Sequence, residues 1–236
     1  GTFTVTQGKV EGLALSAPDF QGDDYFTVGN SIVDGLNTST VAFWFRPDNI
    51  SSAAYMFSCP DVSSGNNGFD LFVQSNVLKG GVKTSSASYG LLTGTTTLVA
   101  DKWHHAVLSV DGSAQSLYLN GVLEATAALD TSSAVIEADA GITEIGRFGS
   151  FGAYFDGEVR DVKHFSNGLS ADQVASLYSG SYNVTPLHWY KLDEGSGNGV
   201  DSGTSPVIAS EVGSCPRIDG TLDLNSPTGD QLRISA

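Results

Sequence analysis

The chain has 236 residues and a formal net charge of −15 at pH 7, because 26 acidic residues outnumber 11 lysines and arginines. This balance argues against nucleic acid and against anionic membrane surfaces as partners, since phosphate binding requires clustered cations. No run of about 18 apolar residues occurs, so the sequence predicts no membrane insertion.

Short strand patterns dominate the sequence, with β-branched and aromatic runs that end at Gly, Asn or Pro. In chain order, we expect strands at Tyr25–Val28, Val41–Arg46, Phe69–Gln74, Trp103–Val110, Ser116–Leu119, Val122–Leu123, Thr143–Gly146, Tyr154–Phe165 and His188–Leu192. The clearest local signal is Asn120-Gly121 between two of these runs. Both central residues of a two-residue hairpin turn need a positive φ, which this pair tolerates, so we expect a hairpin there.

One short helix is expected near residues 170–179. Ser170 can cap its N-terminus, Gln173 completes a capping box, and Gly180 supplies the stop. Many short strands with one brief helix predict an all-β fold, a β-sandwich or jelly roll. Because no low-complexity linker divides the chain, we expect residues 1–236 to form a single domain.

Composition also bears on the compartment. The 28 glycines and few lysines resemble those of extracellular β-rich modules, so we expect an extracellular, cell-surface or virion-surface protein. Cys59 and Cys215 lie far apart in the sequence, and a disulfide requires their Cα atoms to lie within about 7 Å. The sequence leaves both the bonded and the free state open.

Several motifs occur in an order that is typical of one family. These motifs are Gly22–Val28, Val41–Pro47, the run Trp103-His104-His105-Ala106-Val107, Asp111-Gly112, the run Leu117-Tyr118-Leu119-Asn120-Gly121, Ile145-Gly146, Phe155–Val159 and Leu169–Tyr178. Together they resemble the laminin-G-like, concanavalin-A-like lectin/glucanase modules over roughly residues 10–180. The resemblance implies a concanavalin-A-like jelly-roll β-sandwich.

The C-terminal part resembles the opening of the same family. His188–Gly197, followed by Asp201-Ser202-Gly203, is similar to the family's first strand and loop, yet it follows the expected helix. We therefore expect a circularly permuted module in which residues 187–236 complete the sandwich. A second copy of the module is the less favoured alternative, because some 50 residues can hardly bury a core of their own. Exchange of this segment with a neighbouring subunit stays open.

The resemblance also implies a structural calcium ion, which needs six to eight oxygen ligands. The matching residues are Asp193, Glu194 and Asp201 on the loop and Asp161 on the strand. Arg160 stands where the family has its first acid on that strand. The alternative is that these acids are solvated or pair with Arg160.

Sugar binding calls for exposed aromatic faces beside amide and carboxylate groups. The Gly-rich segment 147–154 carries Phe148, Phe151 and Tyr154, and comparable loops carry Asn66, Asn67 and Tyr89. These six residues are the candidate carbohydrate contacts. The alternative for Phe148 and Phe151 is that they pack beneath the loop.

Catalysis has little support in the sequence. Glycosidases need two carboxyl groups at about 5 Å or more, and the odd spacing of Glu158 and Asp161 on one expected strand predicts that they face opposite sides. No histidine has a spaced metal-ligand partner. We therefore expect a non-catalytic, lectin-like or adhesion module that binds a glycan or surface polysaccharide and associates with other protein subunits. The alternatives are a structural or protein-binding module of a virion or bacterial adhesin and, less favoured, a glycan hydrolase or lyase.

Overall fold

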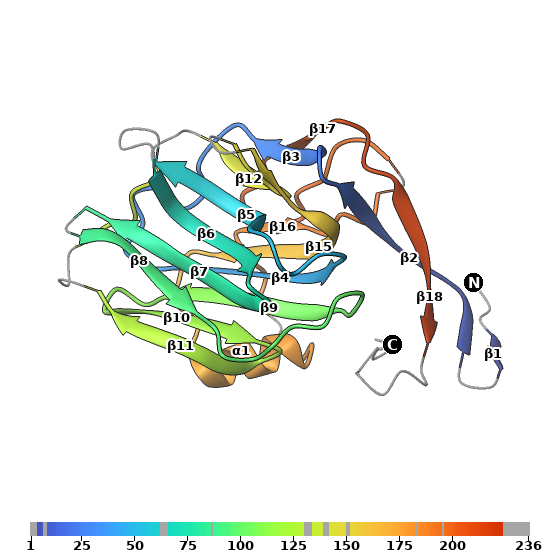
Figure 1. Ribbon diagram of the computed structural model, residues 1–236, viewed down its shortest axis with the longest axis horizontal. Helices are drawn as coiled ribbons and strands as arrows, with labels where there is room; N and C mark the ends of the chain where they lie inside the picture. The colour runs from blue at the N-terminus through green and yellow to red at the C-terminus, as the bar shows by residue number, and fades with distance from the viewer. Residues whose placement is uncertain are drawn as a thin grey trace.

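The computed structural model describes residues 4–6, 9–61, 66–85, 87–129, 134–138, 142–149, 152–182, 184–194 and 196–223. Within these ranges, two antiparallel sheets pack face to face, and one short helix lies against the outer side of one of them (Figure 1). The all-β sandwich predicted from the sequence is confirmed, and the arrangement is consistent with a jelly roll.

The larger sheet has nine strands in the order β1-β2-β15-β4-β9-β10-β11, with β16 also paired to β15 and β18 to β2. Its members are β1 (Thr4–Thr6), β2 (Lys9–Gln21), β4 (Ser39–Pro47), β9 (His104–Val110), β10 (Ala114–Leu119), β11 (Val122–Ala128), β15 (Asp156–Phe165), β16 (His188–Tyr190) and β18 (Arg217–Asp223).

The second sheet has seven strands in the order β17-β3-β12-β5-β6-β7-β8, and a small hairpin joins β13 to β14. Its members are β3 (Tyr25–Val28), β5 (Ala54–Asp61), β6 (Asn66–Gln74), β7 (Val77–Thr84), β8 (Ala87–Thr93), β12 (Thr143–Ile145) and β17 (Ala209–Val212). The small hairpin consists of β13 (Arg147–Phe148) and β14 (Ala153–Tyr154), and helix α1 spans Ala171–Tyr178.

Local chemistry explains where the chain turns. Asn120 has φ 52° and Gly121 has φ 81°, so the expected two-residue hairpin joins β10 to β11. The expected capping box is also present, because the Ser170 hydroxyl accepts the Gln173 N–H and the Gln173 side chain accepts the Ser170 N–H. Among the described residues, no helix is long and apolar enough to cross a membrane.

Alternation along β4 separates the core from the outer side of the larger sheet. Val41, Phe43 and Phe45 are fully buried between the sheets, against residues such as Phe57 and Leu71 of the smaller sheet. The intervening residues of β4 therefore point away from the core. Helix α1 covers part of that outer side through a separate apolar cluster that includes Ala42, Val107, Phe165, Val174 and Leu177.

The C-terminal segment contributes strands to both sheets. β16 pairs with β15, whereas β17 pairs with β3 of the smaller sheet. Asp201 anchors the connection, because its buried carboxylate accepts hydrogen bonds from His188 Nδ1 and from the backbone N–H groups of Trp189, Gly203 and Val207. The circular permutation itself, and the single domain spanning 1–236, stay predictions.

Two further features complete the fold. Cys59 and Cys215 are both buried and are not joined by a disulfide, which resolves the alternative that the sequence left open. β1, the first part of β2 and β18 form an arm that extends away from the sandwich (Figure 1).

Candidate functional site

The outer side of the larger sheet carries polar and aromatic residues next to helix α1. Trp44 and Arg46 alternate with the buried phenylalanines of β4, so both point outward. Register places Trp44 opposite Arg160 on β15 and opposite His105 on β9, while Arg46 lies opposite Glu158. Arg46 forms an ion pair with Glu158 and a longer one with Asp101.

A β-bulge on β15 reshapes this side of the sheet. The register against β4 shifts between Arg160 and Lys163, and Asp161 adopts φ 57° in the left-handed region. One extra residue on the bulged strand allows Val159 and Val162 both to face the core, three positions apart. The Asp161 carboxylate thereby contacts Lys163 and Trp189 on the outer side.

Trp189 on β16 is held in place by its neighbours. Its indole Nε1 donates to Asp161 Oδ1 at 2.5 Å, and the ammonium groups of Lys163 and Lys191 each lie 4.9 Å from the centre of its ring. Such cation–π contacts are attractive because the ring face is electron-rich. Two cations therefore lie close to the ring, and one edge is fixed by a carboxylate.

The other two tryptophans lie along the same side. The Arg160 guanidinium stacks over Trp103 at 4.1 Å. Trp44 stacks on Tyr178 at the end of helix α1, with ring centres 5.5 Å apart, and lies 5.0 Å from His105. We call this surface the tryptophan face; its residues are Trp44, Trp103, Trp189, Arg46, Arg160, Lys163, Lys191, Glu158 and Asp161. It contains all three tryptophans of the chain, each partly exposed.

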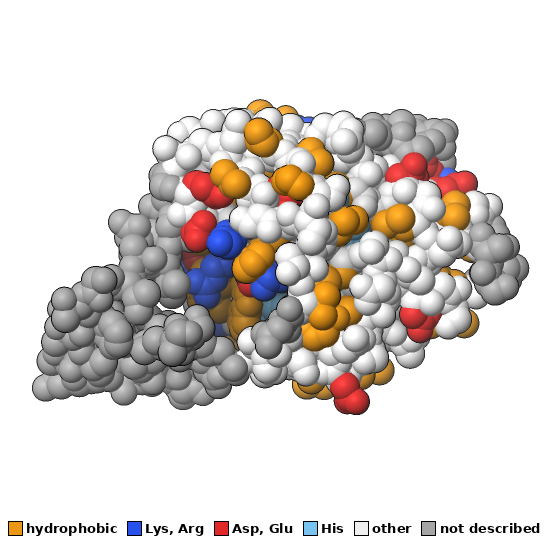
Figure 2. All heavy atoms as spheres, turned by 180° about the vertical axis from the view of Figure 1, so that it is seen from behind, with side chains coloured by type: hydrophobic (Ala, Val, Ile, Leu, Met, Phe, Trp, Pro, Cys, Tyr) orange, Lys and Arg blue, Asp and Glu red, His pale blue; other side chains and the backbone are white. Residues whose placement is uncertain are grey.

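Cations are concentrated on the tryptophan face. The chain has 11 lysines and arginines, and the side chains of Lys9, Arg217 and Arg233 are not described. Of the remaining eight, four belong to the tryptophan face. Figure 2 shows basic side chains gathered on this side of the molecule, beside acidic, apolar and histidine groups.

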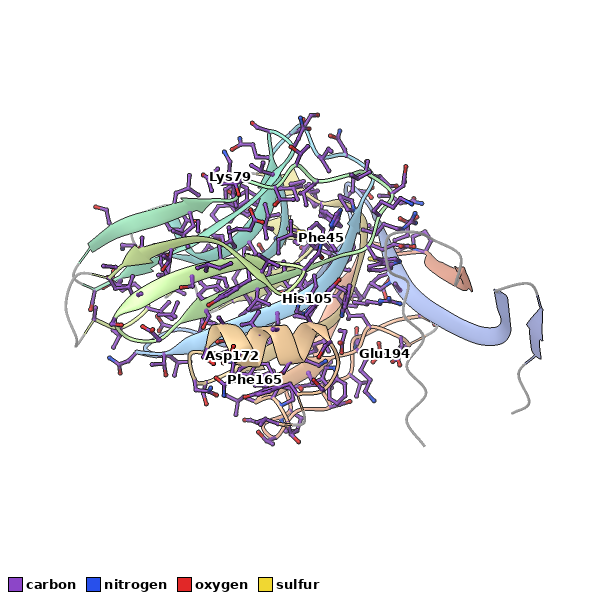
Figure 3. The ribbon with its side chains drawn as sticks, turned by 90° about the horizontal axis from the view of Figure 1, so that it is seen from below. Phe45, Lys79, His105, Phe165, Asp172 and Glu194 are labelled. Atoms are coloured by element: carbon purple, nitrogen blue, oxygen red, sulfur yellow. The ribbon has the colours of Figure 1, made fainter. Side chains whose placement is uncertain are left out.

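The tryptophan face has an acidic end and a basic end. Two carboxyl groups near Arg46 have a raised pKa. For Asp19 and for Asp48 the main cause is burial, and repulsion from neighbouring carboxylates adds to it. At the other end lie Lys163 and Lys191. Between the acidic and the basic end lies His105. Burial, and then the charge of Lys163, lower its pKa to about 3. His105 is therefore neutral at pH 7. Its ring centre lies 5.8 Å from that of Tyr178, and Figure 3 shows His105 next to helix α1.

The sequence matches the model of one known protein family. The model described as the concanavalin A-like lectin/glucanases superfamily matches residues 20–175, about two thirds of the chain. The chain belongs to this superfamily. No curated protein matches the sequence.

Solved structures share the superfamily fold at low sequence identity. A candidate carbohydrate binding protein from Bacteroides ovatus aligns with TM-score 0.67 and 18% identity, over 90% of this chain and 62% of that one. The heptameric SAP-like pentraxin from Limulus polyphemus aligns with TM-score 0.60 and 18% identity, over 90% and 98%. The CBM40 of a Ruminococcus gnavus IT-sialidase, bound to α2,3-sialyllactose, aligns with TM-score 0.55 and 14% identity, over 70% and 99%.

The residues predicted to contact sugar do not share one surface. Phe148 is fully buried with its ring centre 4.8 Å from that of Tyr55, so the prediction of an exposed stacking ring is wrong there. Tyr154 is partly exposed beside Arg147 and Tyr25. Tyr89 lies elsewhere, in strand β8. The β13–β14 hairpin, which carries Tyr154, packs against β5, and β8 is three strands away from β5 in the same sheet. Three strand spacings separate the two positions by about 14 Å.

Two other parts of that prediction have a different outcome. Asn66 and Asn67 lie in strand β6 rather than in a loop, and their side chains are outside the described residues. Phe151 also lies outside the described residues. Their roles stay predictions.

The acids predicted to bind calcium are engaged elsewhere. Asp161 is bonded to Lys163 and Trp189, and the buried Asp201 carboxylate is bonded to His188 and three backbone N–H groups. Glu194 accepts the Val200 N–H, and Asp193 is exposed. Within the described ranges, no three acidic, histidine or cysteine residues are grouped to hold a metal. This donor set does not fit calcium. Binding of the ion itself stays a prediction from the sequence.

Arg160 has a role other than the one considered in the sequence. It stacks on Trp103, whereas Lys163 is the cation bonded to Asp161. The expectation that Glu158 and Asp161 face opposite sides is wrong, because the bulge adds one residue between them and reverses the alternation. Each carboxylate is paired with a cation.

Sequence reasoning did not group the tryptophans, although one signal was available. In Phe43-Trp44-Phe45 the two phenylalanines must share a face, so the tryptophan must point to the other one. An outward tryptophan on a central strand needs a cover or a ligand.

Proposed function

We propose that this domain is a non-catalytic carbohydrate-binding module and that the tryptophan face is its ligand site. The observation that carries the proposal is the presence of three partly exposed indole rings on one side of the larger sheet, interleaved with charged side chains. Trp189 on β16 and Trp103 beside β9 are separated by three strand spacings, about 14 Å. This span accommodates more than one sugar ring.

The chemistry of the face suits sugars. Indole rings provide large, rigid apolar surfaces for the C–H groups of a pyranose. Lysine and arginine donors beside the rings can bind hydroxyl or acidic substituents. The similarity to a sialidase CBM40 bound to sialyllactose and to a candidate carbohydrate binding protein supports the same class of ligand.

Pairing of the carboxylates supports a role without catalysis. Glu158 is bonded to Arg46 and Asp161 to Lys163 and Trp189. A glycosidase needs one carboxyl group that keeps its proton and a second that acts as base or nucleophile. Here both carboxylates are instead held in ion pairs with basic side chains. Incubation of the protein with any glycan it binds should release no new reducing ends.

The test of the proposal compares tryptophan variants on a glycan array, followed by calorimetry on the strongest glycan. Trp189→Ala and Trp103→Ala should each weaken binding by about tenfold or more, since stacking of one ring contributes about 1–3 kcal/mol in comparable sites. Tyr154→Ala, an aromatic truncation on the other sheet, is the matched control and should leave affinity unchanged. Loss of binding in Tyr154→Ala alone would move the site to the 147–154 segment.

A second candidate function is protein binding, as in a structural or adhesive module. The arm of β1, β2 and β18 favours it, because among the described residues β1 and β18 pair only with β2, and each has an edge without a described partner strand. Open edges can add a strand from another chain. Concentration-dependent sedimentation of the full chain, and its loss when residues 1–15 are removed, would support this function.

A further inference from the structure

We propose that the glycan bound by the tryptophan face is acidic, and that its carboxylate or sulfate group lies at the basic end beside Trp189, between Lys191 and Lys163. This inference rests on the proposed function and names the class of ligand. The observations that carry it are the charges around Trp189 and their contrast with the rest of the molecule.

Only one of the two lysines is paired with a carboxylate among the described residues. Lys163 Nζ lies 2.7 Å from Asp161 Oδ2, while Lys191 is exposed and forms no ion pair among the described residues. Both ammonium groups lie 4.9 Å from the Trp189 ring centre. The sum of these charges is +1 around one partly exposed indole. A sugar bound beside that indole would meet an ammonium group.

The location of this charge is notable because the chain carries −15 overall. The same face is acidic at its other end, where Arg46 is surrounded by Glu158, Asp101 and Asp48. An anionic ligand is therefore repelled from the Arg46 end and attracted to the Lys191 end. The charge pattern thus gives a direction to the bound glycan as well as a preference for an acidic one.

The indole is fixed before a ligand arrives. The bond from Trp189 Nε1 to Asp161 Oδ1 holds the ring plane, and Asp161 in turn holds Lys163. Lys163 is mostly covered, whereas Lys191 is free to move its ammonium toward a substituent. Lys191 is thus the residue expected to contact the acidic group directly.

The experiment measures binding of the full chain to matched glycan pairs. One pair is tetragalacturonate and its methyl ester, which differ in the carboxylate charge. The other is a sulfated carrageenan oligosaccharide and its desulfated form, so the two pairs distinguish carboxylate from sulfate. We expect the acidic member of at least one pair to bind more tightly than its neutral partner.

Variants assign the preference to the site. Lys191→Met should reduce affinity for the acidic member by up to about fivefold, as for an exposed ion pair, and Lys191→Glu should reduce it further. Both should reduce affinity for the neutral member by a smaller factor, so that the ratio of acidic to neutral affinity falls. Lys79→Met is the control: it removes the same charge from β7, on the opposite side of the sandwich from helix α1 (Figure 3). It should have no effect.

The possible failures are distinguishable. If neutral and acidic members bind equally, or if Lys191→Met and Lys79→Met behave alike, the acidic ligand is wrong while sugar binding stands. If no glycan on the array binds and Trp189→Ala changes nothing, the proposed function itself is wrong.

Discussion

The indole Nε1 of Trp189 donates a 2.5 Å hydrogen bond to the carboxylate of Asp161, a residue that exists on this side of the sheet only because β15 carries a bulge. The bond joins β16 to β15 of the larger sheet. It also means that the orientation of one ligand-facing ring depends on a residue 28 positions away in the sequence.

Asp161→Asn should therefore separate charge from geometry. The amide oxygen can still accept the indole N–H, and asparagine tolerates a positive φ, so the free energy of unfolding should fall by no more than about 1 kcal/mol. Removal of the negative charge should tighten binding of an acidic glycan. Calorimetry measures this affinity, with Asp23→Asn, on an exposed segment before β3, as the charge control. Weaker binding in Asp161→Asn would contradict the charge argument.

Asp201→Asn should be strongly destabilising. The Asp201 carboxylate is 1% exposed and accepts one imidazole and three backbone donors. An amide leaves at least one buried donor without an acceptor, so we expect a loss of about 3 kcal/mol in urea denaturation. Asp193→Asn, on the exposed loop, should change stability by less than about 0.5 kcal/mol.

Calcium can be tested in the same measurements. Because the four acids are not grouped, a chelator should leave the melting temperature of the wild-type protein unchanged. Stabilisation by added calcium that disappears in Asp193→Asn or Asp201→Asn would restore the calcium site predicted from the sequence.

Stability should fall as pH decreases from about 6.5, with His164 as a major cause. Burial, and then repulsion from His188, lower the pKa of His164 to about 3 in the folded protein. The unfolded chain binds a proton at its ordinary pKa near 6.5, so between these values it binds more protons than the folded state. Each such histidine lowers the free energy of unfolding by up to about 1.4 kcal/mol per pH unit.

His164→Gln tests this contribution. The amide nitrogen replaces Nε2, which bonds to Ser39 Oγ at 3.1 Å. When the free energy of unfolding is measured from about pH 6 down to about pH 4.5, that of His164→Gln should decline less steeply than that of the wild type. His105 has the same shift and continues to contribute, so the slope should not vanish. An unchanged slope would show that His164 is not neutral in the fold.

Phe148→Ala should reduce stability by about 3–5 kcal/mol, because its ring is fully enclosed and packs on Tyr55. Its glycan affinity should be unchanged when measured under conditions in which the variant is folded. Tyr154→Ala, in the same small hairpin and partly exposed, should cost less. Chemical denaturation measures both, and equal effects would mean that Phe148 is not part of the core.

Truncation after Thr185 should abolish cooperative folding. It removes β16 and β17, which pair with β15 and β3 in different sheets, and it exposes core residues that pack on Tyr190 and Leu192. Calorimetry of the truncated chain measures the transition. An unchanged, cooperative melt would exclude the single domain and the permutation.

Features with a local cause were predictable from the sequence. The turn at Asn120-Gly121 and the capping box at Ser170 depend on residues within a few positions of each other. Strand β7 was missed because Gly80-Gly81 hides its pattern. There a Cβ at Gly80 would lie 2.7 Å from the Asp70 carbonyl oxygen, and one at Gly81 would lie 2.1 Å from that of Gly90. These positions need glycine because the backbone of a neighbouring strand lies too close for a side chain. The sequence alone does not show which strand is the neighbour.

The site was harder to predict for a related reason. Trp44, Trp103 and Trp189 belong to β4, to the start of β9 and to β16, which are brought together by long-range pairing. The bulge at Asp161 arises from the register of β15 against β4, so no local pattern could show that Glu158 and Asp161 would face the same side. The expected loop aromatics were a local guess, and packing buried Phe148.

Because the three tryptophans of the chain all lie on one face, the intrinsic fluorescence of the unlabelled protein is a signal from that face alone. Protonated amines beside an indole alter its emission, and a sugar that displaces water from the ring changes it again. A titration followed by tryptophan emission can thus report occupancy without any dye, and single Trp→Phe variants can assign the change to one ring at a time.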